Sequence, residues 1–218
     1  MNIPGTVPKH VESIPWQDYR ASETGLIAYY NSDPVSELAI REIPEQYPSE
    51  VAPDPNYETG TYGLYGCGRN KVRNTLVKAK SRYLFFMTRY EGTIGENYDR
   101  VLVTGYYRVA AVADVQKLHI RYLEEYSCIG SEKCMALRAD EAAFVSVEDA
   151  YEVSSDVLKS WGAATRVTKQ TRIALDEEQT KQVLEHLKSK PNRIDDYIEQ
   201  TKQLSPANQE DEEEEEEI

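Results

Sequence analysis

The sequence predicts an α+β protein: a small, bent, mixed or antiparallel β-barrel with flanking helices and a helical C-terminal third. Two strand-like runs dominate the middle of the chain, "RYLFFMTRY" at residues 82–90 and "RVLVTGYYRVAAVADV" at residues 100–115. They are rich in Val, Phe and Tyr, and the link between them is turn-like, which predicts an antiparallel hairpin with a long loop. After residue 150, apolar residues recur at helical spacing behind capping residues, which predicts helices.

The other expected strands are shorter. "GLIAYYN" at residues 25–31 ends at the turn signal "NSDP", and residues 117–123 and 143–147 read as further strands. Gly105 interrupts a long strand, so we expect a bulge, a sharp bend or a close approach by another group there. Residues 42–66 are rich in Pro and Gly, which predicts a long loop suited to binding or to covering a site.

Capping signals place the expected helices. Ser146 is a candidate N-cap, "SSDVLKSWG" has serine caps and a terminating glycine, and residues 175–190 and 192–204 follow helical spacing. We therefore divide the chain into an N-terminal arm (1–24), a barrel domain (25–150), a helical extension (151–205) and a tail (206–218). Eight of the 38 acidic residues lie at 210–217, which predicts a disordered tail that aids solubility or competes with nucleic acid.

The rest of the composition indicates a cytoplasmic protein. The N-terminal residues lack the pattern of a secretory signal, and no apolar run is long enough to span a bilayer, so we expect no membrane partner. Three cysteines are too few for a disulfide framework, which favours a reducing compartment.

A basic block stands out against the formal net charge of −13. Residues 69–89 hold seven basic side chains and no acidic one, begin after a Gly-rich turn and run into an aromatic strand. Cations that neutralise phosphates beside aromatic rings that stack on bases are typical of proteins that bind single-stranded or flipped bases. A solvated face or a site for an acidic protein partner are the alternatives for such a cluster.

The order of motifs "LIAYYNSDP", "KAKSRYLFFMTRY" and "YDRVLVTGYYRVAAVADV" resembles the PUA-like superfamily, particularly its EVE and ASCH branches. The resemblance covers about residues 25–147. It implies a bent β-barrel that binds RNA or DNA, often with a modified base in an aromatic pocket. It also implies that Tyr29, Tyr30, Asn31 and Ser32, together with Arg69 and Lys71, face the ligand. The long loop at 42–66 and the C-terminal helices depart from compact members of the superfamily.

The leading functional expectation is a nucleic-acid-binding module that recognises an exposed or flipped base, modified or not. The sequence does not discriminate RNA from DNA. The expected backbone-binding residues are Arg69, Lys71, Arg73, Lys78, Arg82 and Arg89, and the expected base pocket comprises Trp16, Tyr29, Tyr30, Asn31, Ser32 and Tyr106.

Two other functions remain open. The C-terminal helices could bind a protein partner while the acidic tail masks the basic block. By analogy with some ASCH-type proteins, Lys80 or Lys71 with Thr75 and Glu91 could hydrolyse a modified nucleoside.

We expect no cofactor, because no phosphate loop, nucleophile elbow or metal-binding helix motif is present, and catalysis is not the leading expectation. A zinc site is a secondary alternative. It would use Cys67, His119, Cys128 and Cys134. Buried free thiols are the commoner state of cysteines without a near partner, so no metal is the leading expectation.

Overall fold

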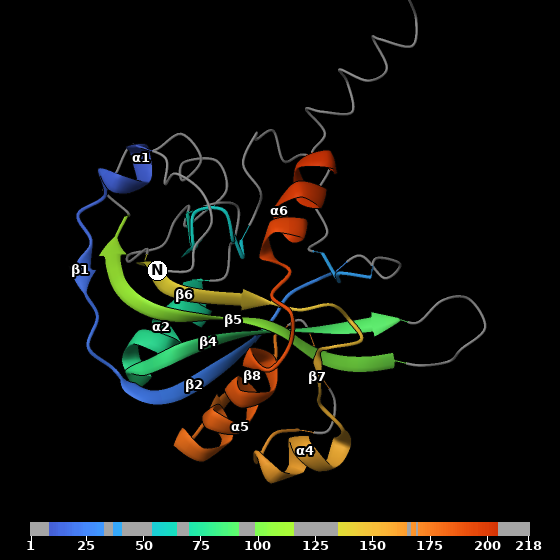
Figure 1. Cartoon of the computed structure of the whole chain (residues 1–218). Coiled ribbons are helices and arrows are strands. Elements are labelled where there is room, and N and C mark those ends of the chain that lie inside the picture. Colours follow the sequence, from blue (N-terminus) through green and yellow to red (C-terminus); the bar gives the residue numbers. More distant parts are fainter. Residues whose placement is uncertain are drawn as a thin grey trace, which may run out of the picture.

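A mixed, mostly antiparallel eight-stranded sheet forms the centre of the described part of the protein (Figure 1). The computed structural model describes residues 9–32, 37–40, 54–64, 70–91, 99–115, 135–164, 167–168 and 170–204. The strands are β1 (Gln17–Asp18), β2 (Ser22–Tyr29), β3 (Thr61–Tyr62), β4 (Ser81–Glu91), β5 (Asp99–Asp114), β6 (Met135–Phe144), β7 (Tyr151–Glu152) and β8 (Arg172–Leu175). The helices are α1 (Lys9–Glu12), α2 (Asn70–Ala79), α4 (Ser155–Ser160), α5 (Glu177–Lys188) and α6 (Ile194–Gln203).

The strands run in the order β3-β6-β5-β4-β2-β8, and β1 and β7 both pair with β5. The expected α+β class is confirmed, but the expected barrel is wrong: β3 and β8, the two ends of this order, do not pair within the described residues. The physical reason lies partly in β8, which pairs antiparallel with β2 and so occupies the edge that barrel closure would need.

The long strand β5 bends the sheet. On one edge it pairs with β4 along Asp99–Arg108 and then with β1 at Ala111 and Val112; on the other it pairs with β7 and then β6. Register shifts interrupt both long ladders, next to Phe86 in β4 and around Val109 in β5. Such bulges increase the local twist, so one strand can belong to differently oriented parts of one sheet. The expected antiparallel hairpin of β4 and β5 is confirmed.

Helices cover both faces of the sheet (Figure 1). One face packs Ile27, Phe85 and Tyr106 against α4 and α5, and the other packs Leu26 and Phe86 against α2 and α6. Because neighbouring residues of a strand face opposite sides, two covered faces require runs that are apolar at every position. This explains the unbroken apolar runs of β2 and β4.

Strands β2 and β4 are parallel neighbours, with residues 30–80 as the crossover and α2 as its last part. Within this crossover, the described residues 54–64 are part of the core rather than an exposed cover. Tyr57 is 1% exposed and packs edge-on against Tyr107, Phe144 and Tyr197. Gly105 makes room for this packing, because a Cβ there would lie 2.5 Å from the Ala143 carbonyl oxygen and collide with the Tyr57 hydroxyl. The close approach expected at Gly105 is confirmed.

Three expected C-terminal helices form, and the serine cap expected on the first of them is confirmed. Ser154 caps α4, and Asp176 forms a reciprocal capping box with Gln179 at the start of α5. The prediction of a helix that begins after Ser146 is wrong. The Ser146 hydroxyl bonds instead to Asp149, in a turn that leads to β7. Strand β8 within this third was not expected, and it places part of the helical extension in the central sheet. Among the described residues, none of the helices has the length and apolar character needed to cross a membrane.

Candidate functional site

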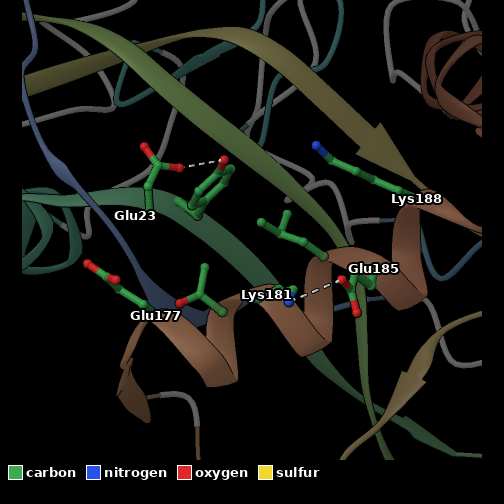
Figure 2. Close-up of a pocket in the computed structure, with 8 residues that line it drawn as sticks. Glu23, Glu177, Lys181, Glu185 and Lys188 are labelled. Atoms are coloured by element: carbon green, nitrogen blue, oxygen red, sulfur yellow. Dashed lines mark hydrogen bonds and ion pairs between the residues drawn. The ribbon is translucent and has the colours of Figure 1, made fainter.

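A partly open cavity of about 400 Å³ lies between α5 and the sheet (Figure 2). Figure 2 shows side chains from successive turns of α5 along one wall and Glu23, from the start of β2, on the other. The lining residues are Glu23, Tyr83, Glu177, Thr180, Lys181, Leu184, Glu185 and Lys188. Its volume is within the range of small-molecule sites, and its lining combines Tyr83 and Leu184 with charged and polar side chains.

Glu23 and Tyr83 form the central polar pair of this cavity. The Tyr83 hydroxyl donates a hydrogen bond of 2.9 Å to Oε2 of Glu23, and the Arg82 guanidinium lies 3.7 Å from Oε1. Burial, together with the bond to Glu23, raises the pKa of Tyr83 to about 12. The phenol therefore keeps its proton at neutral pH and acts as the donor that orients the Glu23 carboxylate.

A second polar cluster adjoins the cavity through Lys188. The Lys188 ammonium lies 2.7 Å from Oε1 of Glu141, which also accepts a 2.5 Å hydrogen bond from the Tyr106 hydroxyl. Burial raises the pKa of Glu141, but the hydrogen bonds from Lys188 and Tyr106 outweigh burial and hold this pKa below its usual value. Burial and the bond to Glu141 raise the pKa of Tyr106. This cluster therefore holds Lys188 at the end of the cavity.

The lysines of α5 differ in how firmly they are paired. Lys181 lies 3.8 Å from Glu185 one helical turn away, and both side chains are largely exposed. Exposed ion pairs of this kind contribute little to stability. A ligand can therefore replace Glu185 as the partner of the Lys181 ammonium at a small cost in free energy. Lys188 keeps its short contact with Glu141 and is the better ordered donor.

Three exposed cations, Arg20, Lys78 and Lys80, lie at one corner of the protein, which we call the basic corner. Their side chains make no hydrogen bond or ion pair with any other described residue. Backbone and side-chain contacts hold the segment before β2 against the end of α2: the Tyr19 hydroxyl donates to the Leu76 carbonyl (3.1 Å) and the Ser22 amide to the Lys80 carbonyl (2.9 Å). Glu23 follows Ser22 within β2, so the start of this strand joins the basic corner to the cavity.

The expected backbone-binding residues do not form one exposed strip. Lys71 and Lys78 are exposed on α2, whereas the Arg73 side chain is fully buried against Gly63. Arg82 donates hydrogen bonds to the carbonyls of Tyr19, Ala21 and Val109 and so has a structural role. Arg89 is half-buried near the other end of β4, and Arg69 lies outside the described residues.

The expected base pocket is not assembled either. Tyr29 and Tyr106 belong to one face of the core and Tyr30 to the opposite face. The Tyr30 hydroxyl donates to the Ala39 carbonyl, and that of Ser32 bonds to Thr88. The remaining expected members, Trp16 and Asn31, are half-buried. Trp16 donates its indole N–H to the Val11 carbonyl, and Asn31 lies just after the end of β2. Tyr106 alone lies next to the cavity, through its contacts with Glu141 and Lys188.

The alternative catalytic residues lie apart. Thr75 bonds within α2 to the Lys71 carbonyl. Lys80 precedes β4 and Glu91 is its last residue, so an extended strand would separate them by about 36 Å. All four alternative zinc ligands lie outside the described residues: Cys67, His119, Cys128 and Cys134. Within the described ranges, no group of three or more metal-ligating side chains is gathered.

Sequence reasoning did not identify Glu23, Tyr83, Lys181 and Lys188 as neighbours. Glu23 precedes an apolar strand, Tyr83 lies inside another, and the lysines are ordinary polar positions of an amphipathic helix, so no local signal marks them. Comparison with protein-family models, with curated proteins and with solved structures gave no match.

Proposed function

We propose that this protein is a nucleic-acid-binding module that contacts phosphates with the basic corner and places one exposed or flipped base in the cavity beneath α5. The observation that carries the proposal is the continuity of the two features: Ser22 contacts Lys80 in the basic corner, and the next residue, Glu23, lines the cavity. A strand of nucleic acid would pass around the start of β2, from α2 on one face of the sheet to the cavity beside α5 on the other.

The cavity has the properties that a single base requires. Its volume of about 400 Å³ suits a ring system of that size, and Tyr83 and Leu184 supply apolar surface. Glu23 offers hydrogen-bond acceptors, and Lys181 and Lys188 offer donors, which matches the mixed edges of a base. The resemblance to PUA-like proteins, which commonly bind RNA or DNA, supports the same function, although the open sheet departs from their barrel.

The small number of cations in the basic corner predicts how strongly binding depends on salt. Three phosphate contacts on a single strand predict a slope of about −2 in a plot of log affinity against log salt, or roughly fifteen-fold weaker binding at 200 mM than at 50 mM salt. The expected interaction is therefore modest in its electrostatic part and depends on the base in the cavity.

The test is binding of labelled single-stranded RNA and DNA to the full chain across a salt series. Neutralising the basic corner with Arg20→Gln, Lys78→Gln and Lys80→Gln should weaken binding at least ten-fold and flatten the salt slope. The charge-matched control, Lys159→Gln, Lys190→Gln and Lys202→Gln, should leave both nearly unchanged. Absence of binding by the wild type, or equal loss in both triple variants, overturns the proposal.

A further inference from the structure

The Glu23 carboxylate lines the cavity and keeps unused acceptor positions. The Tyr83 hydroxyl occupies one lone pair of Oε2, and the Arg82 guanidinium lies 3.7 Å from Oε1. The Glu23 side chain nevertheless remains 63% exposed. A carboxylate has about four acceptor positions, so both oxygens can accept a further hydrogen bond from a ligand. Because Tyr83 already orients the group, little side-chain freedom remains to be lost when a ligand binds.

A carboxylate whose two oxygens each retain an acceptor position selects for two adjacent N–H donors. Guanine presents such a pair on one edge, its ring N1–H and its 2-amino group. Adenine and cytosine place a ring nitrogen with a lone pair beside the amino group, and this lone pair would face a carboxylate oxygen. Uracil has a single ring N–H between two carbonyl oxygens. Of the four standard RNA bases, guanine therefore fits Glu23 without a repulsive contact.

The wall opposite Glu23 is complementary to the remaining groups of guanine. Lys181 and Lys188 extend from α5 and line the same cavity (Figure 2). An ammonium is a donor only, so these lysines suit the acceptors O6 and N7 and would not pair with an amino group at the same place. Lys181 is the more available of the two, since its partner Glu185 lies 3.8 Å away.

From this arrangement we infer that the cavity recognises guanine, with Glu23 accepting from N1–H and the 2-amino group and Lys181 or Lys188 donating to O6 or N7. This inference rests on the proposed function, because it names the base that the nucleic-acid site takes. The hydrogen bond from the Tyr83 hydroxyl supports it, since this bond orients the Glu23 carboxylate in the cavity.

The test compares mononucleotides that differ by single groups. Guanosine, inosine and adenosine 5′-monophosphates are titrated into the full chain by calorimetry and are also used to displace a labelled G-containing oligonucleotide. Inosine lacks only the 2-amino group, so the guanosine compound should bind about ten-fold tighter than either of the others. In Glu23→Gln this preference should fall to two-fold or less.

Glu178→Gln is the matched control. It carries the same substitution on the exposed face of α5, outside the cavity lining, and should retain the full preference for guanosine. Circular dichroism and thermal unfolding verify that both variants fold.

The outcomes separate the two proposals. Oligonucleotide binding without a guanosine preference, or with a preference that persists in Glu23→Gln, overturns the base assignment and leaves the nucleic-acid proposal standing. Oligonucleotide binding that no mononucleotide displaces also overturns the assignment of the cavity. Absence of any oligonucleotide binding overturns the proposed function itself.

Discussion

The Arg82 guanidinium donates a 3.0 Å hydrogen bond to the main-chain carbonyl of Tyr19, 63 residues earlier in the chain. The same group also reaches the carbonyls of Ala21 and Val109. Arg82 thus joins the segment before β2 to strands β4 and β5. It positions the basic corner without being one of its exposed cations.

We predict that Arg82→Ala lowers the free energy of unfolding by about 2–3 kcal/mol, since it leaves several part-buried carbonyls without their charged donor. Lys78→Ala, at an exposed position of α2, should change the free energy by no more than about 0.5 kcal/mol. Urea unfolding monitored by circular dichroism measures both. Equal effects would show that Arg82 does not stabilise the fold through these bonds.

The buried tyrosines predict a loss of stability in alkali. Burial raises the pKa of Tyr19 and of Tyr83 to about 12, above the value near 10 of an unfolded chain. Their contribution to stability is therefore complete below pH 10 and is lost as the pH rises toward 12. Urea unfolding between pH 8 and 12, with tyrosinate absorbance recorded in parallel, should show this decline.

Tyr83→Phe provides the control for that decline, because it removes one of the phenols whose pKa is raised in the folded protein. The variant should be slightly less stable at neutral pH, where the bond to Glu23 is lost, and should lose less stability between pH 10 and 12 than the wild type. A decline as steep as that of the wild type would contradict the assignment to Tyr83.

Thr180→Val should stabilise the protein. The Thr180 side chain is 1% exposed, and its hydroxyl has no hydrogen-bond partner within the described residues. Valine has nearly the same shape, so the change removes an unpaired polar atom and should raise the free energy of unfolding by about 1 kcal/mol. Thr201→Val is the matched comparison: Thr201 is equally buried, but its hydroxyl donates to the Tyr197 carbonyl at 2.6 Å, so the loss should be about 1 kcal/mol. Changes of the same sign in both variants would refute the distinction.

Gly105→Ala should be strongly destabilising, by about 3 kcal/mol, because the new Cβ would collide with the Ala143 carbonyl and the Tyr57 hydroxyl. Gly162→Ala separates this collision from backbone strain. Gly162 has a φ of +66° and open space where a Cβ would be placed, so alanine there should cost only about 1 kcal/mol. Chemical denaturation compares the two, and similar losses would mean that crowding at Gly105 is relieved by small shifts.

The features that the sequence predicted correctly depend on residues close together in the chain. The β4–β5 hairpin, the serine cap of α4 and the close approach at Gly105 each follow from local patterns of burial, capping or backbone freedom. Strand β8 was missed because four residues are too few to show a period. Its partner β2 lies about 145 residues away in the chain, so no local turn signal joins them.

The functional expectations depended on orientation, which charge and composition do not specify. The basic block is continuous in sequence, yet α2 packs Val72 and Leu76 on the sheet, and Arg73 is buried beside them. The tyrosine-rich strands have both faces covered, so Tyr29 and Tyr30 pack in the core. Glu23 and Tyr83 meet only because β2 and β4 are parallel neighbours in the folded sheet.

Strand β8 is synthesised late, and this affects how the nascent chain can fold at the ribosome. Until residues 172–175 emerge, the outer edge of β2 lacks its partner, and the hydrophobic side that α5 will cover is open to water. A nascent chain paused before that point would present an unsatisfied strand edge, the kind of surface that attracts chaperones or pairs with another copy. The last third therefore completes the sheet and covers one of its faces, rather than adding to an already finished domain.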